Sequence, residues 1–166
     1  MNHTRVFAGA YRESVGAFGI TENTLAPKPG RYISPGARSS EPGYAAGGRK
    51  FDLTKLDSAW FERVKDLLRQ ASDRGIVVEL ALFCPMCDDQ TWDICPMNSV
   101  NNVNGIGAVA RNEAFTLKHN NLLDIQIATT RGIVQELKQF DNLYSEVCNQ
   151  PYFGGVTMEW QHRMVD

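Results

Sequence analysis

The stretch NLYSEVCNQPYFGG, residues 142–155, decides how the fold of this chain is interpreted. Residues 143–147 have strand character, and the strand must stop at Pro151 because proline cannot donate to a sheet ladder. Asn149 and Gln150 therefore form a polar pair at the carboxyl end of an apolar strand, followed by aromatic residues and a Gly-Gly turn. That end of a strand is where α/β proteins carry their chemistry. The stretch predicts an α/β protein with its site beside Asn149 and Gln150.

Two other segments predict strands that run parallel to residues 142–149. Residues 4–11 alternate loosely between apolar and polar side chains and are bounded by turn-forming residues. Residues 76–83, IVVELALF, are almost continuously apolar, which is typical of a strand covered on both faces in a parallel sheet. We therefore expect three parallel strands in sequential order.

Both intervals between these strands contain a helical pattern. Residues 55–73 repeat apolar side chains at the spacing of one helix face, and Thr54 with Asp57 resembles a capping pair at its start. Residues 113–140 predict a second helix. Strand, helix, strand, helix, strand is the pattern of right-handed parallel crossovers, so both helices should lie on one outer side. We expect a single domain over residues 1–166.

Two long loops leave the carboxyl ends of strands. Residues 12–50 are rich in proline and glycine and predict a loop without regular structure. Tyr32 and Tyr44 in this loop either stack on sugars or pin the loop to the domain. In residues 83–107, Trp92 offers a stacking surface. The same loop contains four asparagines: Asn98, Asn101, Asn102 and Asn104. Their amides either bind a carbohydrate or satisfy the turns of the loop itself.

Charged residues on the predicted strands need partners. Glu79 interrupts the apolar strand, and by strand alternation it shares a face with Ala81. If that face is interior, Glu79 needs a counter-charge, and Arg5 on the preceding strand is the natural candidate. Glu146 places a second carboxylate below Gln150. Interior charge pairing and catalysis are the two roles open to these acids.

Composition narrows the classes of function. The chain has 166 residues, 43% of them hydrophobic, and a formal net charge of −2. Its basic residues are scattered among acids, so we expect no nucleic-acid or membrane partner. No export signal is visible at the start of the sequence, and the cellular location stays open. No Gly-rich nucleotide-binding motif follows any strand, so we expect no cofactor.

Four cysteines leave two interpretations open. Cys84-Pro-Met-Cys87 has metal-ligand spacing, and Cys95 and Cys148 could converge on it. A structural zinc site is one interpretation. The second CxxC that would make this signal strong is missing, so we favour reduced thiols and no metal.

Asn149-Gln150-Pro151 resembles a motif of a known enzyme clan. In the retaining glycoside hydrolases built on (β/α)8 barrels, the cellulase, mannanase and β-galactosidase superfamily, the fourth strand ends in Asn-Glu-Pro. Arg5 matches the arginine near the start of their second strand. Residues 51–85 resemble the segment from their second helix to their third strand. The resemblance implies that the chain spans strands 2 to 4, about half of a TIM (β/α)8 barrel.

The resemblance also implies roles for individual residues. Gln150 occupies the position of the general acid/base, with Asn149 beside it, and Arg5, Trp92 and Tyr152 are the implied substrate-binding residues. Retaining glycosidases need two carboxyl groups about 5 Å apart. An amide at Gln150 has no proton to transfer at neutral pH, and the nucleophilic Glu belongs to strand 7, which this resemblance does not cover.

Two classes of function follow from this resemblance. The first is a fragment or inactive variant of a hydrolase that acts on β-linked glycosides of oligo- or polysaccharides by the two-carboxylate retaining mechanism. The second is a non-catalytic carbohydrate-binding or scaffold half-barrel. In both cases the partner is an oligo- or polysaccharide, and exposed strand edges predict self-association of the chain.

Overall fold

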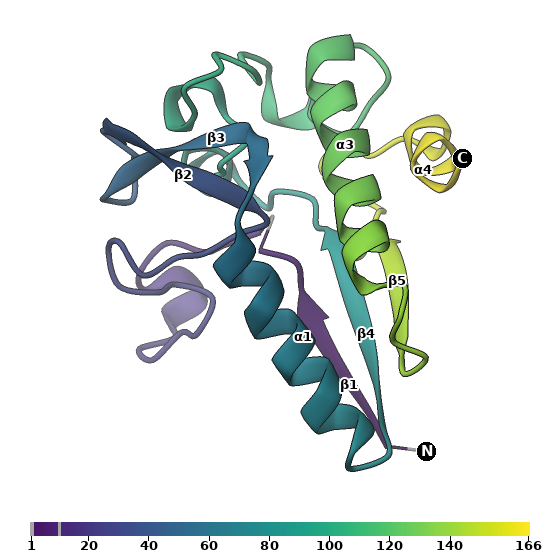
Figure 1. Ribbon diagram of the computed structural model, residues 1–166. Coiled ribbons are helices and arrows are strands. Elements are labelled where there is room, and N and C mark those ends of the chain that lie inside the picture. The colour runs from purple at the N-terminus through teal and green to yellow at the C-terminus, as the bar shows by residue number, and fades with distance from the viewer. Residues whose placement is uncertain (1, 10) are drawn as a thin grey trace.

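The computed structural model describes residues 2–9 and 11–166 and has an α/β fold. A three-stranded parallel sheet contains β1 (Asn2–Phe7), β4 (Ile76–Phe83) and β5 (Leu143–Cys148) in the order β1-β4-β5. The helices α1 (Ser58–Ser72) and α3 (Asn120–Leu137) connect the strands and cover the same face of the sheet (Figure 1). The predicted parallel βαβαβ unit is therefore confirmed.

The first strand is shorter than predicted. It ends at Phe7, whereas the prediction ran from residue 4 to residue 11; residue 10 of that range lies outside the described residues. Gly9 has a φ of +82°, which turns the backbone out of the extended conformation. A Cβ at this position would lie 2.9 Å from the backbone oxygen of Ile33. Glycine allows this close crossing of the two backbone segments.

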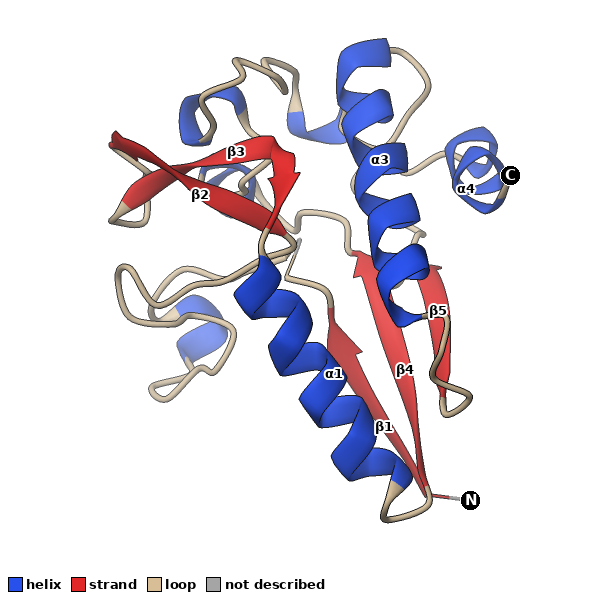
Figure 2. Cartoon of the chain, viewed as in Figure 1, coloured by secondary structure: helices blue, strands red, loops and turns tan. Residues whose placement is uncertain are grey.

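The predicted structureless loop 12–50 is wrong in its second half. An antiparallel hairpin of β2 (Gly36–Pro42) and β3 (Arg49–Leu56) lies there (Figure 2). Thr54 belongs to β3, so the helix does not begin beside it. Asp57 is the N-cap of α1, and its carboxylate accepts from the amides of Ala59 and Trp60 at 2.9 and 3.1 Å.

The second helix also begins later than predicted. The range 113–140 starts in the short 3-10 turn η3 (Arg111–Glu113), and α3 itself begins at Asn120. Glu113 binds Lys118 and His119 side chains at 2.7 and 2.9 Å, which holds the segment before α3 in a turn. The remaining short elements are η1 (Ala17–Gly19), α2 (Asp89–Asp93), η2 (Ser99–Asn101) and the terminal helix α4 (Met158–Val165).

The two faces of the sheet differ in chemistry. On β4, Val78, Leu80 and Leu82 are buried and belong to the main hydrophobic core. Glu79 alternates with them and points to the opposite face, because successive side chains of a strand lie on opposite sides. Among the described residues, no helix is long and apolar enough to cross a membrane.

Candidate functional site

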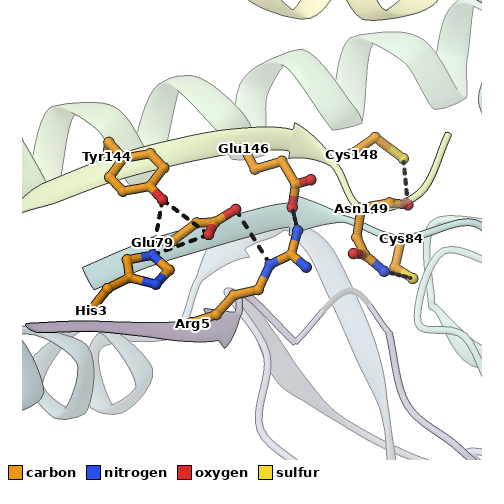
Figure 3. Close-up of polar contacts among 8 residues, drawn as sticks. All are labelled: His3, Arg5, Glu79, Cys84, Tyr144, Glu146, Cys148 and Asn149. Carbon is orange, nitrogen blue, oxygen red and sulfur yellow. Dashed lines mark hydrogen bonds and ion pairs between the residues drawn. The ribbon is translucent and has the colours of Figure 1, made fainter. Parts of the chain in front are cut away.

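A row of charged side chains crosses the sheet on the face away from α1 and α3 (Figure 3). The parallel register puts Arg5 opposite Glu79 and Glu79 opposite Tyr144. Arg5 Nε lies 3.3 Å from Glu79 Oε1, and Arg5 Nη2 donates to Glu146 Oε2. One guanidinium thus joins carboxylates from two other strands. The predicted pairing of Glu79 with Arg5 is confirmed.

The row continues toward the amino end of the strands. Tyr144 Oη donates to Glu79 Oε2 at 3.0 Å and lies 2.9 Å from His3 Nε2. His3 Nε2 is itself 3.2 Å from Glu79 Oε2. His3 was not foreseen as a partner, although its position two residues before Arg5 on a strand places both on one face.

Electrostatics in this row favour the ionised pair. The hydrogen bond to Glu146 raises the pKa of Arg5, so the guanidinium stays charged at any physiological pH. Desolvation, followed by the hydrogen bond to Glu79, raises the pKa of Tyr144 and keeps its phenol protonated. Glu79 and Glu146 therefore act as acceptors of charge-assisted hydrogen bonds, the structural role considered for them.

Asn149 extends the sheet at its carboxyl edge. Its backbone amide donates to Phe83 O at 2.9 Å, and its buried side chain donates to Cys84 Sγ at 3.4 Å. Figure 3 shows Cys84 and Asn149 beyond the carboxyl end of the polar row. Asn149 is thus fixed beside the edge where the loops after β4 and β5 meet.

Gln150 turns the chain away from the sheet. Its φ of +46° is in the left-handed region, which is uncommon for a residue other than glycine. The side chain is exposed and makes no hydrogen bond with the described residues. Its backbone oxygen accepts from Tyr152 N at 2.8 Å, which closes a tight turn. Gln150 is therefore presented to solvent at the carboxyl edge, and Tyr152 follows with 88% of its surface exposed.

Trp92 has a packing role in this structure. It is 5% exposed, and its indole N–H donates to Val109 O at 3.1 Å. The loop asparagines are also used internally: Asn101 Nδ2 donates to Asp93 O and Cys95 O, and Asn102 Nδ2 donates to Ile106 O. For Asn98, Asn101 and Asn102 the structure supports satisfaction of the loop's own turns. Asn104 instead binds Asp52 and Leu53 of β3.

Tyr32 and Tyr44 pin the first loop to the hairpin. Both are buried with Phe51 in a second hydrophobic cluster, and the Tyr44 and Phe51 rings meet edge to face with centroids 5.2 Å apart. The buried Arg12 guanidinium lies 4.9 Å from the Tyr32 ring centroid and donates to Tyr44 Oη at 3.3 Å. These rings stabilise the loop, as the second interpretation expected.

A second polar network at the carboxyl edge was not predicted. Tyr11 Oη donates to the buried Glu13 at 3.0 Å and lies 3.6 Å from Cys87 Sγ, and Asn23 Nδ2 donates to the other carboxylate oxygen of Glu13. Tyr11 lies a few residues after the end of β1. This position near the carboxyl end of a strand was the only feature of the sequence that could have indicated the network.

The four cysteines of the described residues form no disulfide. Burial raises the pKa of Cys84 to about 11 and that of Cys148 to about 12, so both thiols are protonated at neutral pH. Within residues 2–9 and 11–166, no three His, Cys, Asp or Glu side chains gather closely enough to hold a metal ion. Cys84, Cys95 and Cys148 are buried, and Cys87 is exposed.

The fold has a counterpart among solved structures. The crystal structure of a putative glycoside hydrolase from Bacteroides vulgatus matches 98% of this chain with a TM-score of 0.60 and 15% sequence identity. The chain spans 25% of the length of that protein. No protein family model and no curated protein sequence matches the chain. The match shows a shared α/β fold of the kind found in that protein.

Proposed function

We propose that this chain is the acid/base-bearing portion of a β-glycoside hydrolase barrel in which the proton donor is replaced by glutamine. In this proposal, β1, β4 and β5 correspond to barrel strands 2, 3 and 4. The sheet is covered by helices on one face, while its polar face is the side that would line the barrel interior. The ligands are β-linked oligo- or polysaccharides.

The position of Gln150 carries the proposal. It directly follows Asn149 at the carboxyl end of β5, its backbone is held at φ of +46°, and its amide is exposed. Carboxyl ends of parallel strands are where barrel enzymes keep their reacting groups. The distant likeness to a putative glycoside hydrolase supports the same class of function.

The chemistry of the side chains predicts binding without turnover. An amide donates and accepts hydrogen bonds, so Gln150 and the exposed Tyr152 ring can contact a sugar. General acid–base assistance is typically worth about 10²–10⁴-fold in rate, and glutamine cannot supply it. Glu79 and Glu146 are both committed to Arg5 and do not provide a replacement acid.

A second candidate is a carbohydrate-binding module that never hydrolyses its ligand. The same observation favours it, because Gln150 keeps the hydrogen-bonding shape of a carboxyl group and loses the proton. The two candidates differ in whether catalysis returns when the acid and the remaining barrel strands are supplied.

Binding of cello- and manno-oligosaccharides to the whole chain, measured by NMR titration, tests the proposal. We expect saturable binding, no release of reducing sugar, and weaker binding by Gln150→Ala and Tyr152→Ala. Val165→Ala, at an exposed position on α4, is the matched control and should bind like the parent chain. Failure of both ligand series to bind, or equal effects of the control and site variants, would refute the proposed site.

A further inference from the structure

Two buried thiols contact Asn149, and they contact different parts of it. Asn149 Nδ2 donates to Cys84 Sγ at 3.4 Å, whereas Cys148 Sγ donates to the backbone oxygen of Asn149 at 3.8 Å. Both cysteines are buried and belong to the main hydrophobic core. Of these two thiols, that of Cys84 is therefore the one that can orient the side chain of Asn149.

The position of Cys84 is fixed by its neighbours in the chain. It directly follows Phe83, the last residue of β4, and it precedes Pro85, whose ring restricts the residue before it to an extended backbone. Pro85 is itself fully buried. The backbone amide of Asn149 donates to Phe83 O at 2.9 Å, which joins the ends of β4 and β5 at the same place. The thiol thus has a fixed position beside the Asn149 amide.

The hydrogen bond to Cys84 decides which polar atom of Asn149 remains free. Figure 3 shows the amide nitrogen turned toward Cys84 Sγ. The amide oxygen, at the other corner of the group, makes no hydrogen bond with the described residues. Within the described part of the chain, the buried side-chain atoms without a partner are Arg12 Nε and Asn142 Oδ1, so Asn149 Oδ1 is open to solvent. An amide oxygen accepts a hydrogen bond and cannot donate one.

The charge state of the Cys84 thiol fits the part of an acceptor. Burial raises its pKa to about 11, and the hydrogen bond from Asn149 opposes this rise. The thiol is therefore protonated at neutral pH, and its sulfur accepts through a lone pair as a weak acceptor. The main effect of so weak a bond is to select one of the two orientations of the amide. The opposite orientation would present the N–H groups of Asn149 to solvent instead of its oxygen.

We propose that Cys84 is a positioning residue of the carbohydrate site, which turns the Asn149 amide so that its oxygen accepts a hydrogen bond from a sugar hydroxyl. This inference rests on the proposed function, because the ligand is the saccharide proposed there. It adds a polarity to that site: the ligand must present a donor to Asn149, and a group that only accepts is disfavoured. Cys84 contacts the amide and not the sugar, so it acts through Asn149.

The side-chain amide signals of Asn149 in the ligand-free whole chain test the orientation by NMR. They are assigned by their loss in Asn149→Asp. We expect one Nδ2 proton to exchange with water roughly threefold or more slowly than those of Asn121, an exposed residue whose amide nitrogen makes no hydrogen bond with the described residues. Cys84→Ala should remove this protection, and Cys84→Ser, which keeps an acceptor, should retain it. Cys148→Ala is the matched control and should leave the protection unchanged, because it removes an equally buried thiol that bonds to the backbone of Asn149.

Saccharide derivatives test which atom of Asn149 the ligand meets. Cellotriose and mannotriose are compared with derivatives in which one hydroxyl at a time is replaced by hydrogen or by fluorine. One neutral hydrogen bond is worth roughly 3–10-fold in affinity, so loss of one particular hydroxyl should weaken binding to the parent chain and to Cys148→Ala by that factor. Fluorine at the same position cannot donate and should restore nothing. In Cys84→Ala the penalty should fall below about twofold, and in Cys84→Ser it should stay at its parent value.

Three results would overturn the proposal. They are an Asn149 amide that exchanges as fast as that of Asn121, equal effects of Cys84→Ala and Cys148→Ala, and a fluorinated derivative that recovers the lost affinity, which would show that the amide nitrogen faces the ligand. The first of these needs only the parent chain and Asn149→Asp, so it decides the matter even if Cys84→Ala does not fold. Failure of every saccharide to bind would refute the proposed function and the acceptor role together, while the exchange rates would still decide whether Cys84 orients Asn149.

Discussion

Replacing Arg5 with methionine should expose how much the polar row contributes to stability. The substitution keeps a long side chain on β1 and removes the guanidinium that joins Glu79 and Glu146. Both carboxylates then remain on one sheet face without that cation, and they repel one another. Because this one substitution removes two ion pairs, Arg5 is the most informative position in the row.

The magnitude follows from how exposed the partners are. The side chains are 37% exposed for Arg5, 15% for Glu79 and 27% for Glu146. Exposed ion pairs contribute about 0–1 kcal/mol, and removing one partner of a buried pair costs about 3–5 kcal/mol. Because solvent screens Arg5 in part, we expect Arg5→Met to lower the free energy of unfolding by about 1–2 kcal/mol. With an m-value of about 2 kcal/mol/M, the urea midpoint falls by roughly 0.5–1 M.

Urea denaturation followed by circular dichroism measures this change. Arg69→Met is the matched control, because the Arg69–Asp66 pair is long at 3.8 Å and more than half exposed; it should cost under about 0.5 kcal/mol. A double-mutant cycle of Arg5→Met with Glu146→Gln should give a coupling energy of about 1 kcal/mol. An Arg5→Met chain as stable as the parent, or a cost equal to that of Arg69→Met, would refute the reasoning.

Five further outcomes are expected. Gln150→Glu alone should not hydrolyse aryl β-glycosides, because the carboxylates of Glu79 and Glu146 on the same sheet are both paired with Arg5; retaining hydrolysis by this variant in a chromogenic assay would contradict the proposal that a further strand supplies the nucleophile. Iodoacetamide at pH 8 should label the exposed Cys87 and spare Cys84 and Cys148, as read by peptide mass spectrometry. Since folding raises the pKa of Cys84 to about 11 and of Cys148 to about 12, their contribution to stability should be complete below about pH 8.5 and be lost as the pH rises toward those values, which pH-dependent urea midpoints will show. Phe51→Ala, in the second hydrophobic cluster, should cost about 3–5 kcal/mol, and thermal unfolding with a cost below 1 kcal/mol would count against the described packing. The isolated chain should self-associate through the free edges of β1 and β5, and a stable monomer in sedimentation at tens of micromolar would argue against it.

Much of the sheet could be predicted because its strands are locally distinctive. Residues 76–83 are almost continuously apolar, which identifies a strand covered by helices, and Gly75, with φ of +64°, lies in the turn between α1 and β4. The hairpin could not be predicted in the same way. β2 has the polar sequence GARSSEP, and the buried pair Phe51 and Leu53 in β3 was obscured by the capping signal at Thr54 and Asp57.

The site was predictable only where neighbouring strands determine it. Arg5 and Glu79 lie on adjacent strands, and each needs a residue of opposite charge. Strand alternation and charge were therefore sufficient to predict that they pair. The orientation of Trp92 depends on its hydrogen bond with Val109, seventeen residues along the chain. No periodic pattern in the sequence predicts such a contact. Whether a loop aromatic is exposed is decided by tertiary packing, which the composition of a loop does not specify.

The asparagine-rich segment has a consequence for how this protein can change during evolution. Asn101 Oδ1 accepts from Ala45 N at 3.0 Å, Asn104 Oδ1 accepts from Leu53 N at 2.8 Å, and Val103 N donates to Phe51 O at 2.9 Å. Barrel-type enzymes usually diversify by exchanging one loop at a time on a constant framework. Here the loop after β4 supplies hydrogen-bond partners to the β2–β3 hairpin, so a new sequence in either would leave backbone groups of the other unsatisfied. The hairpin and the loop should therefore change together during evolution. A protein engineer should likewise transfer them together.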